Sequence, residues 1–159
     1  MNKSRLRDAL VSKLQAELDL VTRAARMAHE EATHEESKPD NKYDMHAQEA
    51  AYLAEGQARL AKELSDTLGL FGTMPVEPWP GGMPAGIGTL ITLENGKRQT
   101  QYLLGPRSGG LDVEVDGQTV TVVTPSSPLG RQLLGARAGK VVQLPGRGGV
   151  VDHRVVAIE

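Results

Sequence analysis

The sequence predicts an α+β protein, in which a long antiparallel helical hairpin precedes a small antiparallel β domain with one short helix. Residues 1–70 hold only two glycines and one proline, whereas residues 71–88 are dense in both. Beyond them, Val, Thr and Leu are interrupted by turn dipeptides. Helices followed by strands are typical of an α+β architecture. We therefore expect a coiled-coil hairpin over residues 1–70, a linker over 71–86 and a β domain over 87–159.

The first half contains two helices with a coiled-coil pattern. Mostly apolar residues recur at steps of three and four, which is the spacing of a coiled-coil seam. They are Leu6, Leu10, Leu14, Leu18, Val21, Ala25 and Ala28, and then Tyr43, Ala47, Ala50, Ala54, Gln57, Ala61, Leu64 and Leu68. Pro39 interrupts the helical pattern between them, and Asp40 or Asn41 is placed to cap the second helix.

Such a short polar connection predicts that the two helices are antiparallel. Each arm has about 30 residues and is therefore expected to be roughly 45 Å long. A bare helical pair buries little apolar surface, so the hairpin is suited to reaching a distant target. The alternative is that it packs back on the second half within one core.

The second half is expected to form strands and one short helix. The strands are expected at residues 88–94, 98–104, 119–124, 141–144 and 150–158. Asn95 with Gly96 predicts a hairpin turn, and Asp116 with Gly117 predicts another. Residues 126–135 are expected to be helical, with Ser127 as the cap, Pro128 in the first position and Gly135 as the stop.

Composition excludes several classes of function. The formal net charge of −2 leaves no overall basic field for binding nucleic acid. There is no cysteine, which excludes thiol nucleophiles, disulfides and thiolate metal sites. No signal peptide or membrane-spanning stretch is recognisable, so we expect a cytoplasmic protein without a membrane partner. Aromatic residues make up only 3% of the chain, which is few for an aromatic-walled ligand pocket.

Charge is unevenly distributed along the hairpin. Residues 1–29 carry six basic and three acidic side chains, whereas residues 30–44 carry six acidic and two basic ones. Solvated loop charges would explain this pattern, and a functional explanation is also open. In the functional explanation, carboxylates at a protruding tip present oxygen ligands to a Mg²⁺ ion held elsewhere.

Other motifs point to structure rather than chemistry. His29 and His34 are five residues apart, whereas helical zinc sites use a spacing of four, so a metal site is not expected. His46 and His153 are expected to be ordinary surface residues. The glycine-rich segments 105–110 and 145–149 lack the ending of a phosphate-binding loop and are expected to be tight turns.

Two stretches resemble the GreA/GreB family of transcript-cleavage factors. TPSSPLGRQLLGARAGKVVQLPG, residues 124–146, is similar to the family's C-terminal signature: a serine-proline pair, a small helix, a glycine and a G-x-V-V strand. DNKYDMHAQEAAY, residues 40–52, resembles the family helix that follows the tip, E-N-A-E-Y-H-A-A-K-E.

The resemblance implies an FKBP-like C-terminal domain that docks at the rim of the secondary channel of bacterial RNA polymerase, with Ser127 and Pro128 at the docking surface. It implies that the coiled coil enters the channel and that two tip acids help to hold the second catalytic Mg²⁺ and activate water. Backtracked RNA would then be cut near its nascent 3′ end by the polymerase itself. The chain would be an accessory factor rather than an enzyme, without a permanently bound cofactor.

The tip departs from the family pattern D-x-x-E-N. Aligned without gaps, Asp40 and Asn41 take the places of Glu and Asn, and Ser37 takes the place of the first Asp. Glu36 is adjacent and is the candidate for the second catalytic acid beside Asp40. Further tip residues are Tyr43, one position earlier than the family's tyrosine, and Asp44.

Three functions remain open from the sequence. The chain could stimulate RNA cleavage through its tip carboxylates, or it could occupy the channel without chemistry as an inhibitor or regulator. An FKBP-like prolyl isomerase or chaperone is a third possibility. The scarcity of aromatic residues argues against the third, because only Tyr102 follows the linker's Trp79.

Overall fold

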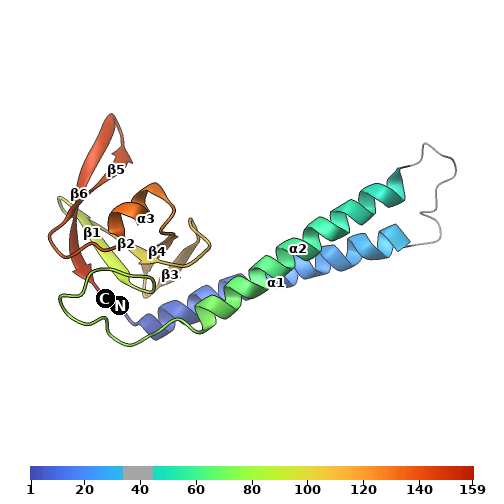
Figure 1. Ribbon diagram of the computed structural model, residues 1–159, viewed down its shortest axis with the longest axis horizontal. Coiled ribbons are helices and arrows are strands. Elements are labelled where there is room, and N and C mark those ends of the chain that lie inside the picture. The colour runs from blue at the N-terminus through green and yellow to red at the C-terminus, as the bar shows by residue number, and fades with distance from the viewer. Residues whose placement is uncertain (34–44) are drawn as a thin grey trace. The chain divides into compact units, whose positions relative to one another are not determined.

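The computed structural model describes residues 1–33 and 45–159. Helices α1 (Lys3–Thr33) and α2 (His46–Gly72) come first. The later elements are β1 (Leu90–Asn95), β2 (Arg98–Leu104), β3 (Asp112–Val115), β4 (Gln118–Val123), α3 (Pro128–Leu133), β5 (Val141–Gly146) and β6 (Gly149–Ile158). The expected fold class, a helical hairpin followed by a small sheet with one short helix, is confirmed (Figure 1).

The described chain forms two compact units. One contains residues 11–72, and the other contains residues 1–10 together with 73–159. The first ten residues therefore cluster with the β domain, although they begin the helix whose remainder forms the hairpin.

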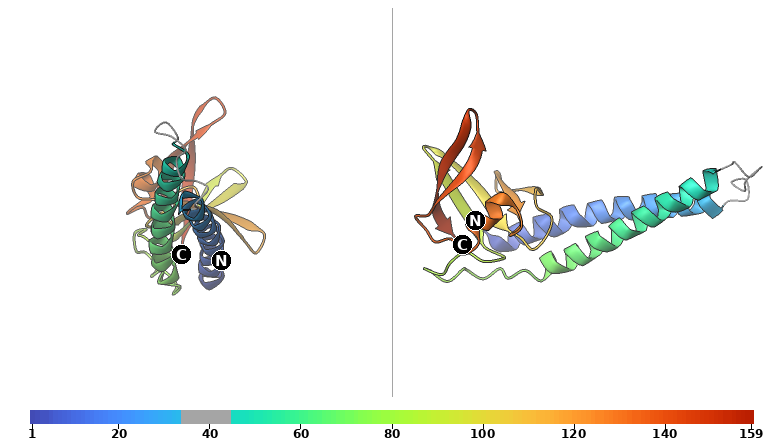
Figure 2. Two further views of the ribbon diagram at one scale, coloured as in Figure 1. Left: turned by 90° about the vertical axis from the view of Figure 1, so that its right-hand side faces the viewer. Right: turned by 45° about the horizontal axis from the view of Figure 1, so that its top comes forward.

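In the hairpin unit, α1 and α2 lie side by side and antiparallel (Figures 1 and 2). The expected seam supplies the buried side chains Leu14, Val21, Ala28, Ala50 and Leu64. By contrast, Leu20 on the opposite face of α1 is 61% exposed. The narrow stripe of burial is the pattern that the three-and-four spacing predicts.

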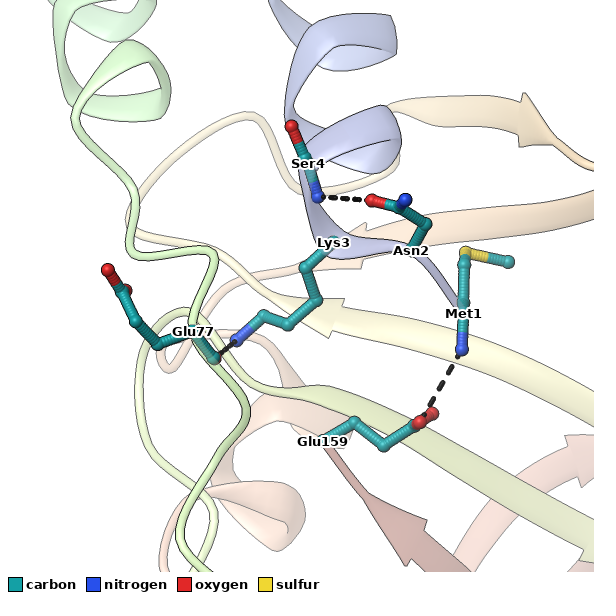
Figure 3. A network of polar contacts seen from close by, with 6 residues as sticks. All are labelled: Met1, Asn2, Lys3, Ser4, Glu77 and Glu159. Carbon is teal, nitrogen blue, oxygen red and sulfur yellow. Dashed lines mark hydrogen bonds and ion pairs between the residues drawn. The ribbon is translucent and has the colours of Figure 1, made fainter.

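Polar contacts hold the first residues within the β-domain unit, as Figure 3 shows. Asn2 Oδ1 caps α1 by accepting from the backbone N–H groups of Ser4 and Arg5 at 3.0 and 3.2 Å. The Met1 ammonium group lies 3.4 Å from Glu159 Oε1, and Lys3 Nζ donates to the main-chain oxygen of Glu77 at 3.4 Å. These contacts join the start of α1 to the last strand and to the segment after α2.

Lys3 carries a charge in a site with little solvent. Only 7% of the residue is exposed. Burial lowers the pKa of its ammonium group, and the carboxylates of Glu77 and Glu159 act in the opposite direction. Exposed Arg5 adds an ion pair, with its Nη1 2.7 Å from Asp116 Oδ1.

The sheet has the strand order β3-β4-β2-β1-β6-β5. The expectation of a wholly antiparallel sheet is wrong at one pair, because β2 and β4 are parallel while the other pairs are antiparallel. In the hairpin of β3 and β4, β3 lies at the edge of the sheet and β4 lies beside β2. The chain runs through β4 in the same direction as through β2. The core between the sheet and α3 consists of Ala85, Ile91, Leu93, Leu104, Val123, Leu133, Ala136, Val142 and Val155.

All five expected strands are present, with ends shifted by up to two residues. Strand β3 was not expected, although Val113 and Val115 are buried in strict alternation with exposed residues. The turn at Asp116 and Gly117 is confirmed, and both residues have positive φ, as a type I′ turn requires. The first hairpin turns instead on Gly96 and Lys97, since Asn95 still pairs with Arg98.

Residues 73–89 contain no helix or strand, but Met74, Ala85 and Thr89 among them are buried. Ala85 belongs to the core and makes two backbone hydrogen bonds with the residues that follow α3: its N–H donates to Ala136 O at 2.7 Å, and its C=O accepts from Gly135 N at 2.8 Å. The second half of the proline- and glycine-rich segment is thus attached to the β domain.

Candidate functional site

The expected tip residues Glu36, Ser37, Asp40, Asn41, Tyr43 and Asp44 lie outside the described residues. Helix α1 ends at Thr33, whose Oγ1 donates to the backbone oxygen of His29 at 2.9 Å. Helix α2 resumes at His46. The catalytic and tip assignments therefore stay predictions.

The serine-proline loop is held by local hydrogen bonds. Ser127 is the N-cap of α3, with extended backbone angles, and its Oγ accepts from Gly130 N at 2.9 Å. The same Oγ donates to the backbone oxygen of Thr124 at 2.8 Å. Pro128 occupies the first turn, where its missing N–H is not needed, and its side chain is exposed. The expected cap and first-position proline are confirmed, and Pro128 is the residue of the pair that faces solvent.

Gly130 permits the close approach on which this loop depends. A Cβ atom on Gly130 would lie only 1.8 Å from the backbone oxygen of Thr124 and 2.9 Å from Ser127 Oγ. Only glycine therefore fits at this position of α3. Gly130 was not among the predicted site residues, although a glycine inside a short helix is a recognisable signal of close packing.

A side-chain amide joins α3 to β5. Gln132 Nε2 donates to Gln143 O at 3.0 Å, and Gln132 Oε1 accepts from Gln143 N at 2.8 Å. The backbone oxygen of Gln132 accepts from Lys140 Nζ at 2.6 Å. This pairing satisfies backbone groups of β5, an edge strand, which would otherwise be unpaired there.

A groove of about 580 Å³ lies beside the loop. We call it the Ser-Pro groove, and it is lined by Gly109, Gly110, Thr121, Val122, Val123, Thr124, Ser126, Ser127, Pro128, Leu129, Gln143, Leu144 and Pro145. This lining contains neither a charged nor an aromatic side chain. Such a surface suits an apolar partner with a few hydrogen-bonding groups, and it lacks the aromatic wall expected of a prolyl isomerase.

The described residues offer no metal site and no membrane span. Within residues 1–33 and 45–159, no three His, Cys, Asp or Glu side chains are grouped closely enough to hold an ion. Across the same residues, no helix is both long and apolar enough to cross a membrane.

The C-terminal part of the chain matches a family model. Residues 84–159, which contain β1–β6 and α3, match the family described as "Transcription elongation factor, GreA/GreB, C-term". Residues 84–159 are a GreA/GreB C-terminal domain. The resemblance expected from residues 124–146 is thereby confirmed for this domain, whereas its likeness to FKBP stays a prediction. None of the curated protein sequences matches the chain.

Solved structures of GreA/GreB-type proteins are similar at low identity. GreA factor homolog 1 (Gfh1) of Thermus thermophilus is 24% identical, with 94% of each chain covered and a TM-score of 0.37. Gfh1 of Thermus aquaticus is 21% identical, with 92% of each chain covered and a TM-score of 0.38. GreA/GreB from Nitrosomonas europaea is 19% identical over 70% of this chain and 91% of that one, with a TM-score of 0.38. The family assignment rests on residues 84–159.

Proposed function

We propose that this chain is a transcription elongation factor of the Gre type that binds bacterial RNA polymerase. The observation that carries the proposal is the GreA/GreB C-terminal domain over residues 84–159. In this proposal the domain docks at the rim of the secondary channel and the hairpin enters the channel. The chain acts on the polymerase's own active site and is not itself an enzyme.

The Ser-Pro groove supports a docking role for the loop. Pro128 is exposed at the groove, while Ser127 uses its hydroxyl within the loop. We therefore assign Pro128 to contact with polymerase and Ser127 to the shape of the loop. The neutral lining favours apolar contact over charge attraction as the source of affinity at this site.

The hairpin unit has properties that suit a channel-entering rod. Its buried apolar side chains lie along one seam, and its outer surface combines charged side chains with exposed apolar ones such as Met27 and Tyr52. Exposed pairs such as Arg26 with Glu30, 3.2 Å apart, lie on that outer surface. The stability of the hairpin therefore depends on this seam.

At the tip, we propose that Asp40 and Glu36 supply carboxylate oxygens to the second catalytic Mg²⁺ of the polymerase. Carboxylates are ordinary Mg²⁺ ligands, and this ion keeps water in its shell. A positioned water near the RNA 3′ end is the nucleophile that hydrolytic cleavage needs.

A cleavage assay on backtracked elongation complexes tests this function. We expect the wild-type chain to accelerate cleavage and Asp40→Ala to lose that acceleration while still binding polymerase. Glu36→Ala should lose it as well if Glu36 replaces the family's first acid, and Glu55→Ala, at an exposed position on α2, serves as the control. Wild-type protein that binds polymerase without accelerating cleavage would contradict the proposed tip chemistry.

The departures at the tip favour a second candidate. Ser37 stands where the family has an acid, and Asp40 is one methylene shorter than the family's glutamate. Metal coordination is sensitive to reach, so a factor with this tip could occupy the channel and regulate polymerase without cleavage. Slower elongation or initiation in the presence of the chain, without cleavage, would support this second function.

A further inference from the structure

A second cavity lies on the core-facing side of the sheet and adjoins the Ser-Pro groove at Leu144 and Pro145. We call it the polar pocket; it measures about 360 Å³. Its lining consists of Asn95, Arg98, Thr100, Tyr102, Leu144, Pro145, Gly146, Val151 and His153. These residues come from the β1–β2 hairpin and the β5–β6 hairpin, which are separated along the chain (Figure 1).

Strand register explains why these side chains converge. Leu93 pairs with Thr100 on one side and with Val155 on the other, so all three share the core face. His153 is two residues from Val155 along β6 and therefore faces the same side. It pairs with buried Val142 of β5, which faces that side too. The expectation that His153 is an ordinary surface residue is wrong, because strand alternation turns its ring toward the core face.

Two polar atoms of this pocket are buried without a hydrogen-bond partner. They are Thr100 Oγ1 and His153 Nδ1. Leaving a buried polar atom without a partner costs about 1–3 kcal/mol, so two on one cavity are unusual for a purely structural surface. A hydroxyl both donates and accepts, and Nδ1 does one or the other according to the tautomer. Both atoms lie beneath the pocket wall, so a rotation of their side chains would bring them to a ligand that carries hydrogen-bonding groups.

The charge of the pocket defines the ligand further. Arg98 lines it, and no acidic residue does. A guanidinium group binds carboxylate or phosphate through two parallel hydrogen bonds. Tyr102, Leu144 and Val151 add an aromatic ring and apolar walls. The volume lies at the small end of the range for ligand pockets.

We infer that the polar pocket binds a small organic anion, in which a phosphate or carboxylate contacts Arg98 and a planar or apolar group lies against Tyr102, Leu144 and Val151. After a rotation of these two side chains, the hydroxyl of Thr100 and Nδ1 of His153 bond the polar atoms of this ligand. This inference rests on the β domain alone and holds whether or not the chain binds polymerase.

The test is an NMR titration of the isotope-labelled full chain with phenyl phosphate, benzoate and neutral benzamide. We expect saturable shifts of the Thr100 and His153 amide signals with at least one of the two anions, and none with benzamide. The anion that binds more tightly identifies the headgroup as phosphate or carboxylate. Lack of saturation with both anions at millimolar concentrations, or equal binding of benzamide, would overturn the inference.

Two variants locate the site. Arg98→Ala should weaken binding about tenfold or more, because it removes charge-assisted hydrogen bonds, whereas Arg107→Ala, at an exposed position outside the pocket, should not. Thr100→Val should weaken binding and yet leave the free protein at least as stable to urea, because it removes a buried hydroxyl that has no partner. Unchanged affinity in Arg98→Ala would contradict the assignment of the anion to this pocket.

Discussion

Gly130 shows how a single atom can determine the shape of a functional loop. A Cβ atom at this position would come within 1.8 Å of the backbone oxygen of Thr124. Because the obstructing atom belongs to the backbone, the clash cannot be relieved by rotating a side chain. The position of α3, and with it the Ser-Pro groove, depends on this contact.

We predict that Gly130→Ala lowers the free energy of unfolding of the β domain by about 1–3 kcal/mol, the usual effect of overpacking. Trp79, the only tryptophan in the chain, provides the fluorescence signal in a urea titration. Gly81→Ala is the matched control, because no atom lies within 4 Å of its added Cβ and its φ is not positive. Equal urea midpoints for Gly130→Ala and Gly81→Ala would refute the role of the close contact.

Lys3 makes stability depend on pH in the alkaline range. Its pKa in the folded protein is lowered from the ordinary 10.5, chiefly by burial. Between the two pKa values the unfolded chain binds more protons, so this residue's contribution to stability rises with pH there. At neutral pH the penalty for burying the charge is present, and it is relieved as pH approaches the unfolded value.

We expect Lys3→Met to remove that rise. Urea midpoints of wild type and Lys3→Met, measured at steps from neutral pH to about pH 10, should show the variant at least as stable as wild type at neutral pH. The difference between the two should shrink or change sign at the alkaline end. The exposed substitution Lys97→Met should run parallel to wild type throughout. A constant difference between wild type and Lys3→Met would contradict the account of Lys3.

At the scale of elements, the hairpin depends on its seam. Leu14 is 1% exposed on α1, whereas Leu20 on the same helix is largely exposed. We predict that Leu14→Ala destabilises the hairpin by about 2 kcal/mol or more, which is the usual effect of truncating a buried leucine to alanine. Leu20→Ala should change stability by less than about 0.5 kcal/mol. Helical circular dichroism during thermal unfolding measures both. Similar losses for the two variants would mean that burial does not follow the seam.

Local patterns predicted most elements because they specify local structure. The seam spacing predicted both helices, and the residues at 127 and 128 predicted the start of α3. The edge strand β3 was missed because it has four residues, two of them acidic, and its alternation is too short to stand out. The parallel pairing of β2 with β4 depends on strand order, which no local pattern specifies.

The site was predictable only in part, for the same reason. Ser127 and Pro128 form a contiguous motif, and the structure places them on one groove. By contrast, the polar pocket brings Arg98 and Thr100 together with His153, more than fifty residues away along the chain. Gly130 was missed because the contact it permits is visible only when the loop is folded.

At the scale of the whole molecule, the proposal combines a channel-entering hairpin with a docking domain. The two functions, cleavage and polymerase binding, can be separated by mutation. Tip substitutions should change cleavage without changing affinity, whereas substitutions at the Ser-Pro groove should change affinity. The polar pocket is a third region, and its lining contains no residue of the serine-proline loop. Variants of this pocket should bind an organic anion more weakly.

The central claim is that the chain binds bacterial RNA polymerase through the groove beside Pro128. The most direct measurement is the affinity of the full chain for core polymerase, compared among wild type, Pro128→Glu and Gln118→Glu. Glutamate is tolerated in the first turn of a helix, so Pro128→Glu introduces a charge into the neutral groove while α3 is retained. Gln118→Glu adds the same charge at an exposed position outside the groove.

We predict saturable binding of wild type and Gln118→Glu, and at least about tenfold weaker binding of Pro128→Glu, at equal urea midpoints for all three proteins. Absence of wild-type binding would contradict the assignment to RNA polymerase, and undiminished binding of Pro128→Glu would contradict docking through the groove.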